Sequence, residues 1–95
     1  MIQSFKDDDT KAFAETGKTR RGWQGAAHVA LRKIDALRAA VTLDDLRSPP
    51  GNRLETLRGD RDGQHSIRIN DQWRICFRWT ERGAEDVEIT DYHKG

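Results

Sequence analysis

The chain has few of the residues and segments that mark secreted or membrane proteins. Its 95 residues include one cysteine, Cys76, which cannot form an internal disulfide and therefore fits a reducing compartment. No run approaches the roughly 18 apolar residues that span a bilayer. The N-terminus has no positive segment followed by an apolar run, as a secretory signal would. We therefore expect a cytoplasmic protein without a membrane segment.

Hydrophobic residues are also scarce, at 35% of the chain, although three Trp and three Phe are enough to form a small core. A chain of this length makes one domain, which we expect to span residues 1–95. The spacing of His, Cys, Asp and Glu matches no zinc or calcium site. Phosphate-loop and Ser-triad motifs are absent as well.

Charge is distributed unevenly, although the formal net charge is only +1. Residues 11–38 contain seven basic and two acidic residues, and residues 47–78 contain seven arginines and four acids. Residues 81–91 reverse the balance, with five acids and one arginine. Such separation is expected when one surface meets a polyanion, but a solvated surface of mixed charge explains it equally well.

The first half of the chain predicts helices. Asp7–Thr10 offers acidic residues and a capping hydroxyl for a short helix that ends near Gly17. Ile2–Phe5 is predicted as a short edge strand, and Ser48–Gly51 should exclude regular structure. A second helix is predicted over about residues 26–40, where apolar residues recur at spacings of three and four: Ala27, Ala30, Leu31, Ile34, Leu37 and Val41.

The second half changes to a period of two, which predicts strands. Because the connections are short and turn-rich, neighbouring strands must run antiparallel. We therefore predict an α+β domain, in which a short N-terminal strand and two helices pack on a C-terminal antiparallel sheet of about four strands. The predicted strands are Arg53–Leu57, His65–Ile69, Gln72–Trp79 and Glu85–Asp91.

The register of the central hairpin can be derived from side-chain alternation. A two-residue loop would place Ile67 opposite Arg74, whereas a three-residue loop pairs Ile67 with Ile75 and Arg68 with Arg74. The three-residue loop is therefore favoured, because it keeps the apolar side chains on one face. The same rule pairs Ile75 with Ile89 and Phe77 with Val87. One face of the sheet becomes apolar, and the other carries Arg68, Arg74 and Arg78, with Tyr92 arriving beside them.

Arg68 and Arg74 are candidate site residues, because two like charges directly opposite each other destabilise a sheet. An anion between them would remove that cost, since guanidinium groups fit phosphate oxygens well. Alternatively, Glu88 or a turn aspartate neutralises the pair, or water solvates it. The tail Asp91, Tyr92 and His93 adds three groups capable of proton transfer, although a lone C-terminal histidine is usually only solvated.

The chain resembles the HigB-type toxins of the RelE/ParE superfamily. The resemblance covers most of the chain and is most specific in Ser66–Ile75 and in Asp91-Tyr92-His93, with support from Pro49–Asn52, Arg53–Arg61 and Val87–Ile89. It implies a RelE-like fold and ribosome-dependent cleavage of mRNA in the ribosomal A site, without a metal or cofactor.

The resemblance also implies roles for individual residues. Arg68 and Arg74 would bind the phosphate, and Tyr92 and His93 would transfer protons with the assistance of Asp91. Some relatives place a histidine near the position of Asn52 or Arg53, where this chain has none. Basic residues outside the reaction centre would contact RNA or the ribosome: Lys18, Arg20, Arg21, Arg32, Lys33 and Arg78.

The implied partner is a HigA-type helix-turn-helix antitoxin, through which the complex would reach operator DNA. Two alternatives remain open at this point. One is a ParE-like poison of DNA gyrase, against which the Asp91-Tyr92-His93 tail argues, and the other is a non-catalytic binding module with the same fold. Discrete mRNA cleavages after induction would distinguish the nuclease from both.

Overall fold

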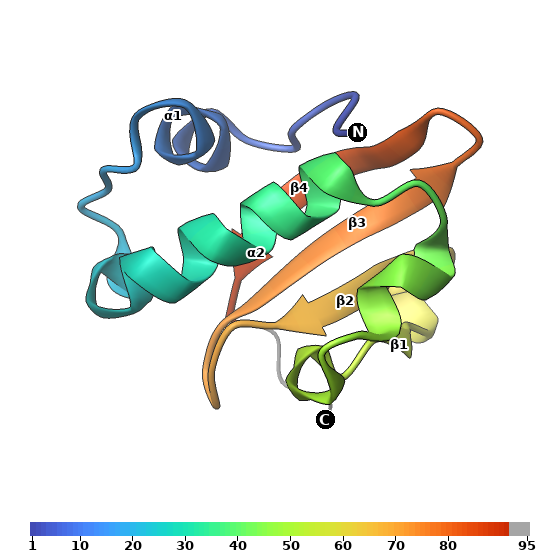
Figure 1. Ribbon diagram of the computed structural model, residues 1–95. Coiled ribbons are helices and arrows are strands. Elements are labelled where there is room, and N and C mark those ends of the chain that lie inside the picture. The colour runs from blue at the N-terminus through green and yellow to red at the C-terminus, as the bar shows by residue number, and fades with distance from the viewer. Residues whose placement is uncertain (92–95) are drawn as a thin grey trace.

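The computed structural model describes residues 1–91 and shows two helices beside one antiparallel sheet (Figure 1). The strand order is β1-β2-β3-β4, and each strand is antiparallel to its neighbour. This confirms the predicted α+β class. The elements are α1 (Asp8–Thr16), α2 (Ala27–Ala39), β1 (Glu55–Thr56), β2 (His65–Arg68), β3 (Arg74–Thr80) and β4 (Gly83–Thr90), with 3₁₀ turns at Gly22–Ala26, Leu43–Arg47, Pro50–Asn52 and Gly59–Arg61.

The core lies between the two helices and the apolar face of the sheet. Ile67, Ile75, Phe77 and Val87 are fully buried there, as the alternation predicts. Trp73 and Trp79, at the ends of the same face, pack against the core while remaining partly exposed. The helices therefore cover one face of the sheet and leave the opposite face to carry the polar side chains.

Helix α1 begins with a different cap from the one the sequence predicts. The Asp7 carboxylate, rather than a hydroxyl, accepts the Thr10 backbone N–H at 2.7 Å. Thr10 itself is fully buried, and its hydroxyl accepts the backbone N–H of Ile89 in β4. The helix ends at Gly17 as predicted, because glycine readily adopts the left-handed conformation found there, with φ of 74°.

Helix α2 buries Ala30, Ile34 and Leu37 as its periodicity predicts. The prediction fails at Val41, which is 84% exposed. Ala40 adopts an extended conformation and ends the helix, so the apolar stripe stops one turn earlier than its spacing suggests. The following segment forms the 3₁₀ turn Leu43–Arg47, which begins with a capping box between Thr42 and Asp45.

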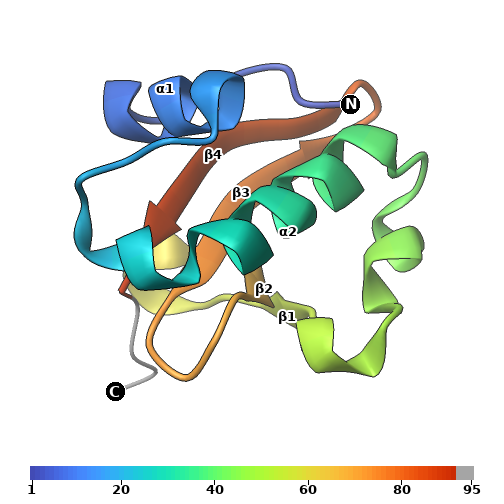
Figure 2. The same cartoon turned by 60° about the vertical axis from the view of Figure 1, so that its left-hand side comes forward.

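The N-terminal segment runs parallel to β4 along its outer edge. It forms two isolated bridges, Ile2 with Ala84 and Phe5 with Val87, instead of a continuous strand. Figure 2 shows this segment lying beside β4. The edge of β4 is thereby covered over Gly83–Val87, which shields its backbone groups from pairing with another chain.

Strand β1 is shorter than the predicted Arg53–Leu57. The preceding Pro50–Asn52 segment forms a 3₁₀ turn, although Ser48–Gly51 was expected to exclude regular structure. Arg53 then adopts a left-handed conformation with φ of 46°, so only Glu55 and Thr56 pair with β2. No helix in residues 1–91 is both long enough and apolar enough to cross a membrane.

The register of the β2–β3 hairpin is the predicted one, with Ile67 opposite Ile75 and Arg68 opposite Arg74. Ile75 also pairs with Ile89, as predicted. The register then shifts between Cys76 and Arg78, so the expected pairing of Phe77 with Val87 is not part of the ladder. Asp86, with φ of 52°, supplies the irregular residue in β4.

Candidate functional site

The open face of the sheet carries Arg68, Arg74 and Thr90 in one row across three strands. Arg68 of β2 lies opposite Arg74 of β3, and Arg74 lies opposite Thr90 of β4. Both arginines are partly buried. The structure therefore brings together the two guanidinium groups that the sequence singles out, on the face away from the helices.

Arg68 is already paired with a carboxylate. Its guanidinium contacts Asp71 of the β2–β3 loop, and the Asp71 side chain is 97% exposed. This matches the alternative in which a turn aspartate neutralises one arginine. Ion pairs with so exposed a partner stabilise little, so an incoming phosphate can replace Asp71 at low cost.

Arg74 has no comparable partner among residues 1–91. Its Nη1 atom is buried and makes no hydrogen bond. Burying a polar N–H without an acceptor costs about 1–3 kcal/mol. Arg74 is therefore poised to bind an anion that supplies the missing acceptor.

The next row of the same face consists of Ser66, Cys76 and Glu88. Burial raises the pKa of the Cys76 thiol to about 11, so the thiol stays protonated and is a poor nucleophile. Ser66 is also fully buried, and its hydroxyl has no hydrogen-bond partner among residues 1–91. Over the same range, no group of three His, Cys, Asp or Glu side chains could hold a metal ion.

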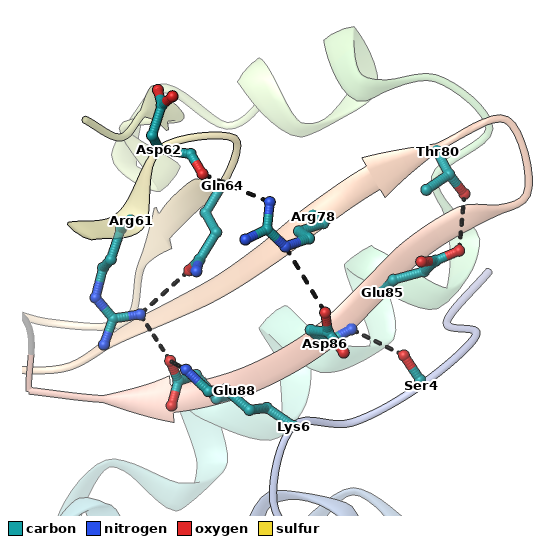
Figure 3. A network of polar contacts seen from close by, with 10 residues as sticks. All are labelled: Ser4, Lys6, Arg61, Asp62, Gln64, Arg78, Thr80, Glu85, Asp86 and Glu88. Atoms are coloured by element: carbon teal, nitrogen blue, oxygen red, sulfur yellow. Dashed lines mark hydrogen bonds and ion pairs between the residues drawn. The ribbon is translucent and has the colours of Figure 1, made fainter. Parts of the chain in front are cut away.

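Glu88 sits between Arg61 and Lys6, two cations that are not among the predicted site residues. Arg61 donates to Glu88 Oε1 at 2.6 Å, and Lys6 approaches the same oxygen at 3.4 Å (Figure 3). Arg61 also donates to Gln64 Oε1 at 3.2 Å. Arg61 and Gln64 come from the connection between β1 and β2, Lys6 from the N-terminal segment and Glu88 from β4. No periodic pattern connects them in the sequence.

Arg78 shares the open face but lies toward the other end of β3. Its Nε atom is 3.7 Å from Asp86 Oδ2, and its Nη1 is 3.5 Å from the Asp62 carbonyl oxygen (Figure 3). The side chain is 45% exposed. Arg78 therefore lies at the periphery of the open face, while the row containing Arg68 and Arg74 forms the centre of the candidate site.

The C-terminal candidates are only partly described. Asp91 is exposed, and its Oδ2 accepts a hydrogen bond from Gln72 Nε2 at 3.1 Å. This contact ties the end of the β4 segment to the β2–β3 loop, which also carries Asp71. Tyr92 and His93 lie outside the described residues, so their roles remain predictions.

Most of the predicted basic surface is exposed. Lys18, Arg20 and Arg21 line an open pocket of about 700 Å³ between α1 and the Gly22–Ala26 turn, and Arg32 is exposed on α2. Arg21 Nε lies 3.5 Å from Asp9 Oδ2. These four cations are available to a polyanion.

Lys33 is the exception, because it is buried and cannot belong to that exposed surface. Its ammonium donates to the side-chain oxygen of Asn52. Burial lowers the pKa of Lys33, and the neighbouring charge of Arg32 lowers it further. The helix periodicity places Lys33 outside the apolar stripe, but the Pro50–Asn52 turn brings Asn52 against it.

Comparisons with known proteins agree with the fold. A family model described as the RelE-like toxin of the type II toxin–antitoxin system HigB matches residues 3–93. The chain is 41% identical over 95 residues to Toxin HigB-1 of Vibrio cholerae, covering 99% of each protein. It is 29% identical over 99 residues to Endoribonuclease HigB of Proteus vulgaris, covering 98% of this chain and 100% of that relative.

Two helices packed on a four-stranded antiparallel sheet, together with this match, define a RelE-like toxin. The chain belongs to the HigB family of type II toxin–antitoxin systems. The partner of such a toxin is an antitoxin.

Proposed function

We propose that this toxin is an endoribonuclease that cleaves mRNA in the ribosomal A site and thereby inhibits translation in the cytoplasm. The observation that carries the proposal is the pair Arg68 and Arg74, opposite each other on the open face, with a buried Arg74 N–H that lacks an acceptor. A phosphodiester supplies that acceptor. The relative named Endoribonuclease HigB supports the type of reaction.

In the proposed reaction, the RNA 2′-hydroxyl attacks the adjacent phosphorus, and the 5′-oxygen of the next nucleotide leaves. The products are a 2′,3′-cyclic phosphate and a 5′-hydroxyl. Arg68 and Arg74 bind the phosphate and stabilise the negative charge that develops on its oxygens. Tyr92 and His93 remove the hydroxyl proton and protonate the leaving oxygen, while Asp91 assists them. These side chains supply base, acid and cations without a metal or cofactor.

Exposed cations outside the centre hold the RNA backbone of the ribosome and the message. This role is proposed for Lys18, Arg20 and Arg21 beside α1, for Arg32 on α2 and for Arg78 on β3. Contacts of this kind depend on charge and are independent of sequence. Lys33 is left out because its ammonium is buried against Asn52.

The proposed antitoxin is a HigA-type helix-turn-helix protein. It would silence the toxin in the complex and carry the contact with operator DNA, so the toxin itself would touch DNA only through its partner. The neighbouring reading frame provides a direct check, since a small helix-turn-helix protein should be encoded there.

The central test is induction of Arg74→Ala and His93→Ala variants in growing cells, followed by primer extension on mRNA. Each variant should relieve growth arrest and abolish the discrete cleavages seen with the wild type. Arg47→Ala is the control, because Arg47 is exposed and pairs with Asp44, which is exposed as well. Full toxicity of either site variant would remove that residue from the mechanism.

The pairing of Arg68 with Asp71 favours one alternative, a binding module with little nuclease activity. The same experiment separates it from the nuclease, since a module produces no cleavage. Gyrase inhibition without cleavage would instead place the chain with the ParE-like poisons.

A further inference from the structure

The carboxylate of Glu88 lies close to the arginine on which the proposed function depends. Glu88 is opposite Cys76, and Arg74 is opposite Thr90, so Glu88 and Arg74 are diagonal neighbours on the open face. Diagonal neighbours in an antiparallel pair are about 7–8 Å apart, which long side chains can bridge. A Glu88 carboxylate without another partner could therefore reach the Arg74 guanidinium.

Arg61 holds Glu88 in a different contact. The Arg61 Nη1 to Glu88 Oε1 distance is 2.6 Å, and the two side chains are only 21% and 13% exposed. Gln64 accepts a second hydrogen bond from the same nitrogen of Arg61, which orients its guanidinium (Figure 3). A short, charge-assisted bond between two partly buried groups is strong.

Lys6 is a weaker partner for the same oxygen. Its Nζ atom lies 3.4 Å from Glu88 Oε1, and its side chain is 52% exposed. Exposed lysine pairs of this kind stabilise little. Arg61 is therefore the residue that fixes the Glu88 carboxylate.

This arrangement leaves the buried Nη1 N–H of Arg74 without an acceptor. Nη1 of Arg74 lacks a hydrogen-bond partner among residues 1–91. A released Glu88 carboxylate would be a suitable acceptor for it, and the resulting ion pair would neutralise the charge needed by a phosphate.

We propose that Arg61 is a positioning residue of the toxin: by binding Glu88, it keeps that carboxylate away from Arg74 and leaves Arg74 open to the RNA phosphate. The inference rests on the proposed function, because it concerns the same phosphate site. Arg61, a turn residue, acts on the phosphate site through Glu88.

The test combines removal of the Arg61 charge with removal of the Glu88 charge. Arg61→Met keeps most of the side-chain length, and it should lower the rate of mRNA cleavage on translating ribosomes by about tenfold or more, the effect of losing a charged hydrogen bond. Adding Glu88→Gln should restore cleavage to within about threefold of the Glu88→Gln single variant, since a neutral amide competes poorly for Arg74. Arg61→Lys, which keeps the charge, should lose less activity than Arg61→Met.

Arg47→Met is the matched control, because it makes the same substitution at an exposed arginine paired with Asp44. It should cleave mRNA like the wild type. Thermal unfolding of each variant reports on folding, and the rescue identifies the cause, because a merely structural role of Arg61 would not be repaired by Glu88→Gln. If Arg61→Met unfolds, the comparison of Arg61→Lys with and without Glu88→Gln serves the same purpose.

Two results overturn the inference. Wild-type cleavage by Arg61→Met, with Arg74→Ala inactive, means that Glu88 does not capture Arg74. Loss of cleavage in Arg61→Met without rescue by Glu88→Gln means that Arg61 acts in another way. Full cleavage by Arg74→Ala would overturn the proposed function, and this inference with it.

Discussion

Lys33 and Asn52 form a buried polar pair, and both side chains make hydrogen bonds. The Lys33 ammonium donates to the Asn52 side-chain oxygen, and Asn52 Nδ2 donates to the Leu46 and Ser48 carbonyl oxygens at 3.1 and 3.3 Å. The pair therefore connects α2 to the turn that precedes β1. A buried charge is tolerated only while its acceptor remains in place.

Asn52→Ala should lower the free energy of unfolding by about 3 kcal/mol, because it leaves the Lys33 ammonium buried without an acceptor. Lys33→Met should cost less, since it removes the buried charge and keeps most of the packing volume. Urea unfolding of the two variants gives the comparison. Equal losses would show that the hydrogen bond, and not the stranded charge, sets the cost.

His65 provides a pH-dependent contribution to stability. Burial lowers the pKa of His65 from its usual 6.5, and the ring packs on Phe77 with centroids 6.0 Å apart. The folded state therefore disfavours the protonated ring, and the unfolded state binds the proton more readily. The resulting stability is fully present above pH 6.5 and is lost as the pH falls from there through the folded-state pKa.

We accordingly expect His65→Leu to weaken the loss of stability between pH 7 and pH 5, measured as the shift of the urea midpoint. His28→Leu is the matched control, because it makes the same substitution at a histidine that is exposed on α2. An unchanged acid dependence in His65→Leu would assign the effect to other groups.

The N-terminal segment and β4 depend on close backbone contact at Gly83. The residue has φ of 120°, and a Cβ atom there would lie 2.1 Å from the Met1 carbonyl oxygen. Only glycine fits such an approach without moving one of the two segments. The parallel bridges at Ile2 and Phe5 rely on the same alignment.

Gly83→Ala should therefore destabilise the protein by about 2 kcal/mol or more, through backbone strain and displacement of the N-terminal segment. Hydrogen exchange should show faster exchange at the Ala84 and Val87 amides, which donate to Met1 and Ser4. Gly51→Ala is the control, because nothing lies within 4 Å of the Cβ position there. Unchanged exchange at both amides would mean that the segment does not depend on Gly83.

At the scale of the whole molecule, aromatic packing ties the basic segment to the apolar face of the sheet, at the end where β3 begins. Trp23, which follows the segment containing Lys18, Arg20 and Arg21, packs edge-on against Trp73 with centroids 5.7 Å apart. Trp73 directly precedes Arg74. Figure 2 shows the segment after α1 on the same side of the molecule as the β2–β3 loop.

Binding of the toxin to ribosomes should weaken as salt rises, because cations released from RNA favour the complex. Lys18→Ala and Arg20→Ala should each reduce the slope of log K against log salt by about 0.7–0.9 if each side chain contacts one phosphate. Sedimentation with ribosomes at several salt concentrations measures this slope. Arg47→Ala should keep the wild-type slope. If Lys18→Ala and Arg20→Ala kept the wild-type slope as well, these contacts would be contradicted.

The amino-acid sequence by itself determined the class of the fold, the family and the row that contains Arg68 and Arg74. Side-chain alternation is a local property. Of the two loop lengths compared, three residues between β2 and β3 keep the apolar side chains on one face. The end of α1 at Gly17 is equally local, since it depends on one residue that tolerates a left-handed backbone.

Only the tertiary structure decided which cations stay exposed and which are buried or paired. Lys33 is removed from the surface by Asn52, 19 positions later, and Arg61 is directed to Glu88 across 27 positions. The bulge in β4 and the early end of α2 at Ala40 also depend on the tertiary structure. Contacts between distant segments depend on how turns fold back on the sheet, and no periodic pattern in the chain encodes that geometry.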